Sequence, residues 1–209
     1  MNAYLQVSEL ACLRGERQLF HDLFFDLEAG TLMRIEGANG SGKTSLLRML
    51  GGLTQPAAGR IQWNMVPIDE LGERYRESVF LLGHQNALKD ELSPIENLEL
   101  AAALHGIPIQ RADAMESLTS LGLSGATVQL PVRLLSQGQK RRAALAALAF
   151  RTQAPLWLLD EPFAALDPEA IRAVALRIAT QLERGGIVVY TTHQEVALSA
   201  PRRASVLLQ

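Results

Sequence analysis

The chain contains 209 residues, of which 48% are hydrophobic and 20% charged, and its formal net charge at pH 7 is −2. This composition is typical of a globular protein with a sizeable buried core, and it excludes an intrinsically disordered chain. The slightly negative charge excludes a general electrostatic attraction to nucleic acid, so we expect no nucleic-acid partner.

Cysteine content and hydropathy indicate the compartment in which the chain works. Cys12 is the only cysteine, so an internal disulfide is impossible. The opening stretch MNAYLQVSEL lacks the basic and apolar regions of a secretion signal, and no apolar run approaches the roughly 18 residues that a membrane-spanning helix requires. We therefore expect the cytosol as the compartment and only a peripheral role at any membrane.

Strand patterns dominate the first third of the chain. Residues 4–10, 23–30 and 31–37 are predicted strands, and the third runs directly into a glycine-rich loop. The following stretch KTSLLRMLGGL has helical spacing and ends at a pair of glycines. A turn and a strand within 54–63 and a continuous apolar strand within 78–85 come next.

A helical pattern replaces the strands from about residue 93 to residue 123. Ser93 is the predicted N-cap of its first helix, with Pro94 at the first helical position and Glu96 completing a capping box. This stretch reads as a helical insert.

The α/β pattern resumes after a helix that starts near Ser136. The stretch PLWLLDEP is a predicted buried strand, and a helix from Pro168, the strand GIVVYTTH and a short final strand ASVLLQ follow it. We expect one domain over 1–209, in which a helical subdomain at about 86–150 is inserted into an α/β core.

The glycine-rich loop GANGSGKT fits the pattern G-x-x-x-x-G-K-[ST] between a strand and a helix. Its backbone N–H groups and the helix N-terminus attract phosphate, Lys43 is placed to reach the β- and γ-phosphates, and Thr44 offers a hydroxyl to Mg²⁺. A glycine-rich turn that merely joins the strand to the helix is the alternative. The predicted phosphate-binding residues are Gly37, Ala38, Asn39, Gly40, Ser41, Gly42, Lys43, Thr44 and Ser45.

Two adjacent acids follow the predicted buried strand at 156–159. Asp160 is placed where α/β sheets bind ligands and is the candidate Mg²⁺ ligand. Glu161 points to the other side of the strand and is the candidate base that orients the attacking water. A solvated acid pair at a strand end is the alternative.

The stretch LSQGQKRR at 135–142 carries two interpretations. Ser136 and Gln139 form a capping box, which by itself explains a helix start. Gly138 in the first helical turn costs about 0.8–1 kcal/mol relative to alanine, which indicates a phosphate approaching the backbone there. The basic run of Lys140, Arg141 and Arg142 is interpreted as a solvated helix face, with a phosphate-rich or protein partner as the alternative.

Together these motifs resemble the ATP-binding-cassette (ABC) ATPases. Their signature L-S-G-G-Q corresponds to Leu135–Gln139, with glutamine at the third position. The resemblance implies an α/β fold, a P-loop NTPase ABC cassette with an N-terminal antiparallel β part, a mixed or parallel core sheet and a helical subdomain. It also implies a head-to-tail dimer in which each ATP lies between the phosphate loop of one chain and the signature of the other, here Ser136, Gln137, Gly138 and Gln139.

The remaining family landmarks follow in order. Gln85 matches the Q-loop glutamine, which implies a third Mg²⁺ contact beside Thr44 and Asp160. Asp167 matches the D-loop, and it is also a suitable helix N-cap. His193 matches the switch histidine and is assigned with Glu161 to catalysis; without the family context it would be interpreted as a loop histidine.

The adenine contact departs from the family pattern. Many cassettes stack an aromatic ring on the base, whereas this chain offers Arg14 just before Gly15. A guanidinium plane can also stack on a base, so Arg14 is the predicted adenine contact.

ABC cassettes serve three classes of role that could apply here: transport coupling, chromosome organisation and action on ribosomes. The segment between Lys43 and Gly138 is too short for the coiled coil of the second class and shows no sustained heptads. Members of the third class usually carry two cassettes per chain. Transport coupling is therefore the prediction.

The residue sequences of these motifs resemble those of the ATPase subunits of bacterial cytochrome c maturation, also called heme exporter ATP-binding proteins. The resemblance implies ATP and Mg²⁺ as cofactors, integral-membrane subunits of the maturation complex as partners, and a functional link to a periplasmic heme chaperone. The expected location is the cytoplasmic face of the bacterial inner membrane. No C-x-x-C-H is present, so direct heme binding is not predicted. An ATPase of another small exporter, or a soluble ABC ATPase, remains the alternative.

Overall fold

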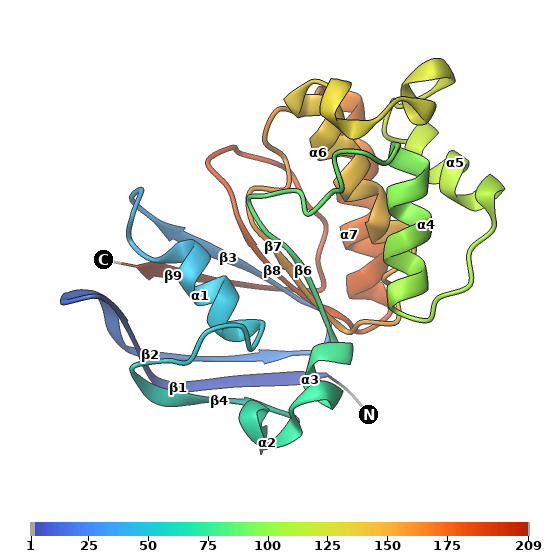
Figure 1. The fold of residues 1–209 in the computed structure, drawn as a ribbon. Helices are drawn as coiled ribbons and strands as arrows, with labels where there is room; N and C mark the ends of the chain where they lie inside the picture. Colours follow the sequence, from blue (N-terminus) through green and yellow to red (C-terminus); the bar gives the residue numbers. More distant parts are fainter. Residues whose placement is uncertain (1–2, 209) are drawn as a thin grey trace.

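Two β-sheets and a group of helices make up the structure, a computed structural model that describes residues 3–208 (Figure 1). The antiparallel sheet has the order β2-β1-β4-β5, built from Arg17–Glu28, Tyr4–Arg14, Ala58–Trp63 and Val66–Pro67. The parallel sheet has the order β6-β7-β8-β3-β9, built from Val79–Leu82, Leu156–Leu159, Ile187–Thr191, Thr31–Gly37 and Arg202–Leu208. The predicted strands are thus confirmed within the described residues, although the strand predicted at 23–30 begins earlier, at Arg17. Gln209, the last residue of the predicted final strand, lies outside the described residues.

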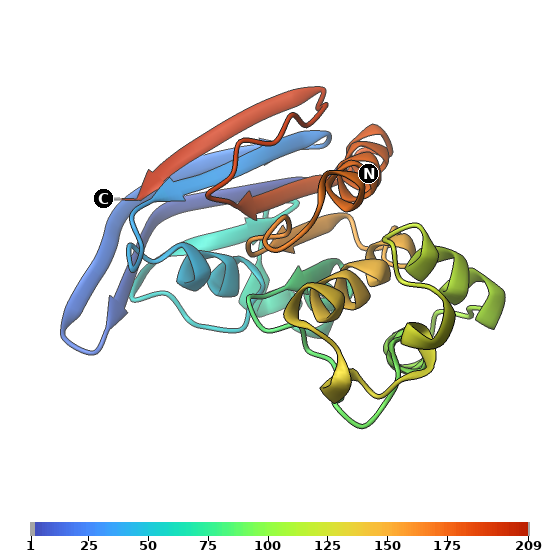
Figure 2. The same ribbon diagram turned by 90° about the horizontal axis from the view of Figure 1, so that it is seen from above.

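The helices occupy the connections between these strands. They are α1 (Lys43–Leu50), α2 (Ile68–Leu71), α3 (Glu73–Glu77), α4 (Pro94–Leu104), α5 (Arg111–Thr119), α6 (Gln137–Ala146) and α7 (Pro168–Glu183), with 3₁₀ turns at Gly125–Gln129, Val132–Leu134 and Ala147–Ala149. Figure 2 shows the green to yellow helices gathered at one end of the molecule, away from the blue β1–β2 hairpin tip. The domain boundaries given above stay a prediction.

The central strands are apolar on both faces because each face is covered. Leu156 and Leu158 of β7 pack with α1 in a core between the two sheets, whereas Trp157 and Leu159 pack with α4, α6 and α7 on the opposite face. Continuous apolar strands of this kind require cover on both sides, which the helix-sheet-helix arrangement supplies.

Capping residues define where the helices begin. Ser93 and Glu96 form the predicted capping box of α4, and Asp167 caps α7 through a 2.8 Å bond from the Ala170 N–H. Ser136 and Gln139 form the predicted box at α6. These caps are confirmed.

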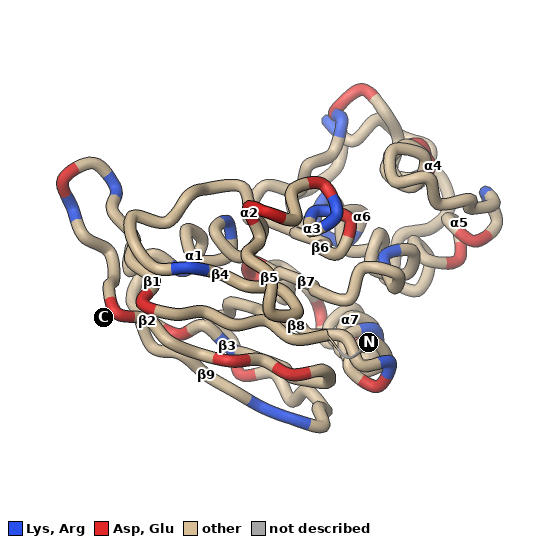
Figure 3. The backbone as a smooth tube through the Cα atoms, turned by 90° about the horizontal axis from the view of Figure 1, so that it is seen from below, with Lys and Arg blue, Asp and Glu red and all other residues tan. Residues whose placement is uncertain are grey.

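Charged residues of both signs are spread along the sheets and the helices, including the turn between β1 and β2 (Figure 3). Within residues 3–208, no helix combines the length and the hydropathy that a bilayer crossing requires.

The carboxyl ends of β3, β7 and β8 meet at one edge of the parallel sheet, because parallel neighbours end on the same side.

Candidate active site

The phosphate loop, residues 37–44, joins the end of β3 to the first turn of α1. Gly37 has φ of +142°, and a Cβ there would lie 2.6 Å from the Ser41 Oγ. Gly42 has φ of +106°, and a Cβ there would lie 3.0 Å from the Phe20 ring. Both positions therefore require glycine for conformation and for space.

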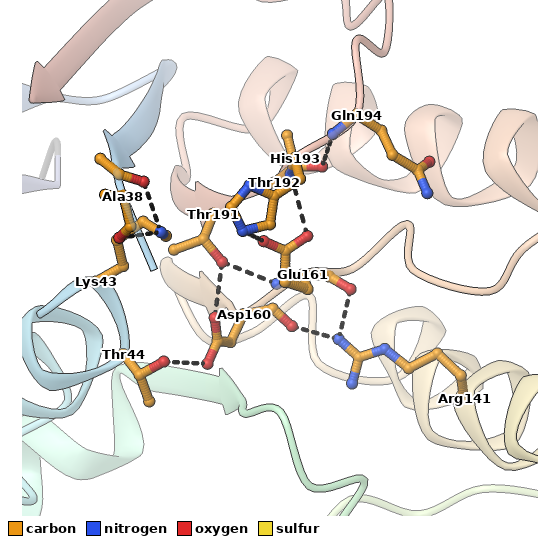
Figure 4. Close-up of polar contacts among 11 residues, drawn as sticks. Ala38, Lys43, Thr44, Arg141, Asp160, Glu161, Thr191, Thr192, His193 and Gln194 are labelled. Carbon is orange, nitrogen blue, oxygen red and sulfur yellow. Dashed lines mark hydrogen bonds and ion pairs between the residues drawn. The ribbon is translucent and has the colours of Figure 1, made fainter. Parts of the chain in front are cut away.

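Lys43 folds back over this loop. Its Nζ donates to the carbonyl oxygens of Gly37 at 2.7 Å and Ala38 at 3.0 Å (Figure 4). The Ser41 Oγ is buried and has no hydrogen-bond partner within residues 3–208. A curled backbone, a positioned ammonium group and an orphaned buried hydroxyl fit a site for phosphate oxygens.

Asp160 lies between two threonine hydroxyls directly after β7. Its Oδ2 accepts from the Thr44 Oγ at 2.8 Å and its Oδ1 accepts from the Thr191 Oγ at 2.7 Å. The side chain is buried, and over the described part of the chain it forms no ion pair. A buried carboxylate beside a hydroxyl supplies the hard oxygen ligands that suit Mg²⁺.

Glu161 has a strained backbone and a carboxylate that faces His193. Its φ is +51°, an uncommon value for a residue other than glycine, and its N–H donates to the Thr191 Oγ at 2.9 Å. Its Oε2 accepts from the His193 N–H at 3.3 Å, and its Oε1 lies 3.5 Å from His193 Nε2 (Figure 4). Oε1 is buried and has no hydrogen-bond partner in residues 3–208, so this carboxylate oxygen keeps unused acceptor capacity, while the catalytic role of Glu161 stays a prediction.

These groups line one cavity of about 400 Å³. Arg14 reaches it from the end of β1, which is compatible with its predicted adenine role. His84 lines the cavity, whereas Gln85, next to it, is exposed and outside the lining; its Mg²⁺ role stays a prediction. The lining consists of Arg14, Leu19, Asn39, Gly40, Gly42, Lys43, Thr44, Ser45, His84, Asp160, Glu161 and His193.

The predicted signature residues lie at the start of α6, outside the lining of this cavity. Within the chain they serve as a helix cap, and a Cβ on Gly138 would lie 3.1 Å from the Ala165 carbonyl oxygen. The Asp167 pKa lies below its usual range because the Ala170 N–H and the Arg142 guanidinium donate to the carboxylate. The contact of these segments with ATP of a second chain stays a prediction.

The basic run after the signature is not a solvated face. Arg141 is buried and donates to backbone carbonyls, including that of Glu161 at 3.0 Å, and Arg142 bonds Asp167 at 2.6 Å. Lys140 is half-buried and lies 3.5 Å from Asp90. The interpretation of this run as a solvated face was therefore wrong, because the loops after β6 and β7 pack against α6 and bind these side chains.

Sequence reasoning also missed Thr191, which links Asp160 to the Glu161 backbone. A buried threonine at a strand end carries no distinctive local signal. The bonds that Thr191 and Arg141 make join segments far apart in the chain, so only the folded arrangement reveals them.

Comparison with known proteins shows the family of the chain. The family model described as "ABC transporter" matches residues 20–164. The chain belongs to the ABC transporter family. As an ABC ATPase it binds nucleotide and hydrolyses ATP, and the ABC cassette fold predicted from the motifs is confirmed.

Curated relatives align with nearly the whole length of this chain. It is 49% identical to the cytochrome c biogenesis ATP-binding export protein CcmA of Dechloromonas aromatica, covering 94% of this chain and 95% of the relative. The protein of the same name from Escherichia coli O157:H7 is 43% identical, with 97% and 96% covered. The chain therefore belongs to this branch of the family, which confirms the predicted resemblance.

Among solved structures, a putative ABC transporter ATP-binding protein from Pyrococcus furiosus has a TM-score of 0.82 at 25% identity, with 98% of this chain and 97% of that chain covered. An ATP-binding cassette solved as a dimer with ADP and Pi has a TM-score of 0.76 at 23% identity, with 91% and 88% covered, and supports the fold alone.

Proposed function

We propose that this chain is the ATP-hydrolysing subunit of a complex that exports or delivers heme for c-type cytochrome biogenesis. The single observation that carries the biological role is the 49% identity to an export protein named for cytochrome c biogenesis, over 94% of the chain. The chemistry is supported by the cavity that Lys43, Asp160 and Glu161 line together. Thr191, outside the lining, hydrogen-bonds both acids.

The proposed reaction is attack of water on the γ-phosphorus of ATP, with ADP as leaving group. Residues 37–45 hold the phosphates through backbone N–H groups, and the Lys43 ammonium neutralises negative charge on the β- and γ-phosphates. The Glu161 carboxylate, which lines the cavity, accepts the proton of the attacking water. His193 contacts the same carboxylate and helps to orient the γ-phosphate.

Mg²⁺ is the proposed metal, held by Thr44 and Asp160 with Gln85 as the further predicted contact. When bound, Mg²⁺ neutralises phosphate charge. The Thr191 hydroxyl keeps the Asp160 carboxylate in place, since it donates to the oxygen that Thr44 does not use.

A second copy of the chain is the proposed partner that completes each site. The residues 136–139 lie at a helix N-terminus outside the cavity, so they are available to bind the nucleotide of a neighbouring chain. Arg14 is the proposed contact for adenine.

Integral-membrane subunits of the maturation complex are the proposed anchors, which places the chain peripherally on the cytoplasmic face of the inner membrane. Docking through the helical segment after Gln85 is proposed, because that segment directly follows the predicted nucleotide-sensing glutamine, whose neighbour His84 lines the cavity. A functional link to a periplasmic heme chaperone belongs to the same proposal.

The test replaces Glu161 by glutamine in a strain that expresses the variant as its sole copy. The membrane complex is expected to assemble, because the substitution keeps the shape of the side chain, while heme-stained periplasmic extracts lose their c-type cytochromes. Normal cytochrome levels in that strain would reject the maturation role in favour of another small exporter, and would leave the ATPase chemistry to be judged by its own assay.

A further inference from the structure

Arg141 joins three segments that surround the catalytic carboxylate. It lies on α6 and is only 6% exposed. One guanidinium nitrogen, Nη1, donates to the Gly83 carbonyl and to the Asn86 side chain, both at 3.0 Å. The other, Nη2, donates to the carbonyl oxygens of Asp160 and Glu161 (Figure 4).

This guanidinium is held by neutral oxygens instead of a carboxylate. Among the described residues Arg141 forms no ion pair, and burial lowers its pKa, partly offset by the charges of Asp160 and Glu161. A planar fork with several donors can bridge two loops at once, which a lysine ammonium cannot do in the same geometry. Its removal takes one donor from each of the Gly83, Asp160 and Glu161 carbonyls.

The bonds from Arg141 act on a strained residue. Glu161 has φ of +51°, and such a backbone persists only where its surroundings hold it. Its N–H donates to Thr191, and its carbonyl accepts from Arg141 and from the Ala164 N–H, so the peptide groups on both sides of its Cα are held. These contacts, together with the bond from the His193 N–H to the carboxylate, set the direction of the Glu161 side chain.

The Nη1 group of Arg141 binds the segment that follows β6. Gly83 and Asn86 flank His84, which lines the cavity, and Gln85, the predicted metal contact. The same side chain rises from α6, whose first turn is the proposed contact for the second chain's nucleotide. A shift of α6 therefore reaches the Glu161 backbone through a single residue.

We infer that Arg141 is a positioning residue for hydrolysis, which couples the position of α6 to the orientation of Glu161 without touching the nucleotide. This inference rests on the proposed function, because it takes Glu161 as the carboxylate that orients water.

The test compares Arg141→Met with Arg177→Met in the full-length chain. Arg177 is a matched control, since it is also an arginine held by carbonyl and hydroxyl oxygens, at Leu145, Ala146, Ser117 and Ser120, and burial lowers its pKa to about 10. These contacts lie in the helical segment, away from the two acids. Both variants are expected to unfold at lower temperature than the wild type.

Only Arg141→Met is expected to lower kcat, by roughly 10–100-fold, while the KM for ATP changes by less than about threefold. Arg141→Lys keeps one donor group and is expected to recover part of this loss. For Arg177→Met, kcat is expected to stay within about twofold of the wild type.

Equal kcat losses in the two methionine variants would overturn the inference, since the effect would then be general destabilisation. If Arg141→Met does not fold, Asn86→Ala carries the test, with an expected fall in kcat of about 2–5-fold; no fall would overturn the inference. Glu161→Gln in the same assay separates the two proposals. If Glu161→Gln hydrolyses ATP normally, the proposed role of Glu161 fails, whatever the arginine variants do.

Discussion

Thr191→Val isolates one hydroxyl on which both acids of the site depend. Valine keeps the shape of the side chain and suits the end of a strand, so the change removes the hydroxyl and little else. The wild-type Oγ donates to Asp160 at 2.7 Å and accepts from the Glu161 N–H at 2.9 Å, and the side chain is fully buried.

The expected loss follows from these two bonds. A hydrogen bond to a charged group contributes about 1.5–3 kcal/mol, and a buried N–H left without a partner costs about 1–3 kcal/mol. Because the two effects share one hydroxyl, the free energy of unfolding of Thr191→Val is expected to fall by about 2–5 kcal/mol. A looser Glu161 backbone is expected to lower kcat at least about tenfold.

Thr192→Val is the matched control. Thr192 is the next residue, is also buried, and accepts one neutral bond from the Gln194 N–H at 3.0 Å. Loss of this bond in Thr192→Val is expected to lower the free energy of unfolding by only about 0.5–1.5 kcal/mol and to leave kcat nearly unchanged. Urea unfolding and steady-state hydrolysis check both variants. Equal unfolding midpoints and equal turnover for the two valine variants would refute the role assigned to the Thr191 hydroxyl.

Lys43→Ala is expected to abolish nucleotide binding, because the loop loses the ammonium that its carbonyls position; titration with a fluorescent ATP analogue checks this, and near-normal affinity would contradict it. Arg14→Ala is expected to weaken ATP binding by about 0.5–2 kcal/mol while kcat changes little, and an unchanged Kd would remove Arg14 from the base contact. Asp167 has a lowered pKa, so its contribution to stability is present above the unfolded pKa of about 3.9 and is lost as pH falls through the folded pKa. The gap in unfolding free energy between wild type and Asp167→Asn is therefore expected to shrink below about pH 4, and a gap that is constant from pH 7 to pH 2 would contradict this.

The sequence was most informative where function depends on local geometry. The phosphate loop, the buried strand before Asp160 and the caps at Ser93 and Ser136 each occupy a few adjacent residues, so residue type and spacing suffice to predict them. The family resemblance extended these local predictions to the whole fold.

Contacts between distant segments could not be predicted in this way. Arg141 lies 58 positions from Gly83 and 20 from Glu161, and Thr191 lies 31 from Asp160. A basic run on a helix is usually solvated, and only the packing of the loops after β6 and β7 against α6 reverses that expectation. His84 is a further example. The family motif predicts a site role for Gln85, but the structure places the neighbouring residue, His84, in the cavity lining.

The most direct test of the central claim is phosphate release in a single turnover by wild-type chain and by Glu161→Gln, with ATP affinity measured on the same samples. The account predicts near-normal ATP affinity for Glu161→Gln, because the amide keeps the shape of the side chain, together with a fall in the rate of phosphate release of at least about 100-fold, because the amide cannot accept the proton of water. Equal rates of phosphate release from the two proteins would contradict the assignment of Glu161 as the hydrolytic carboxylate.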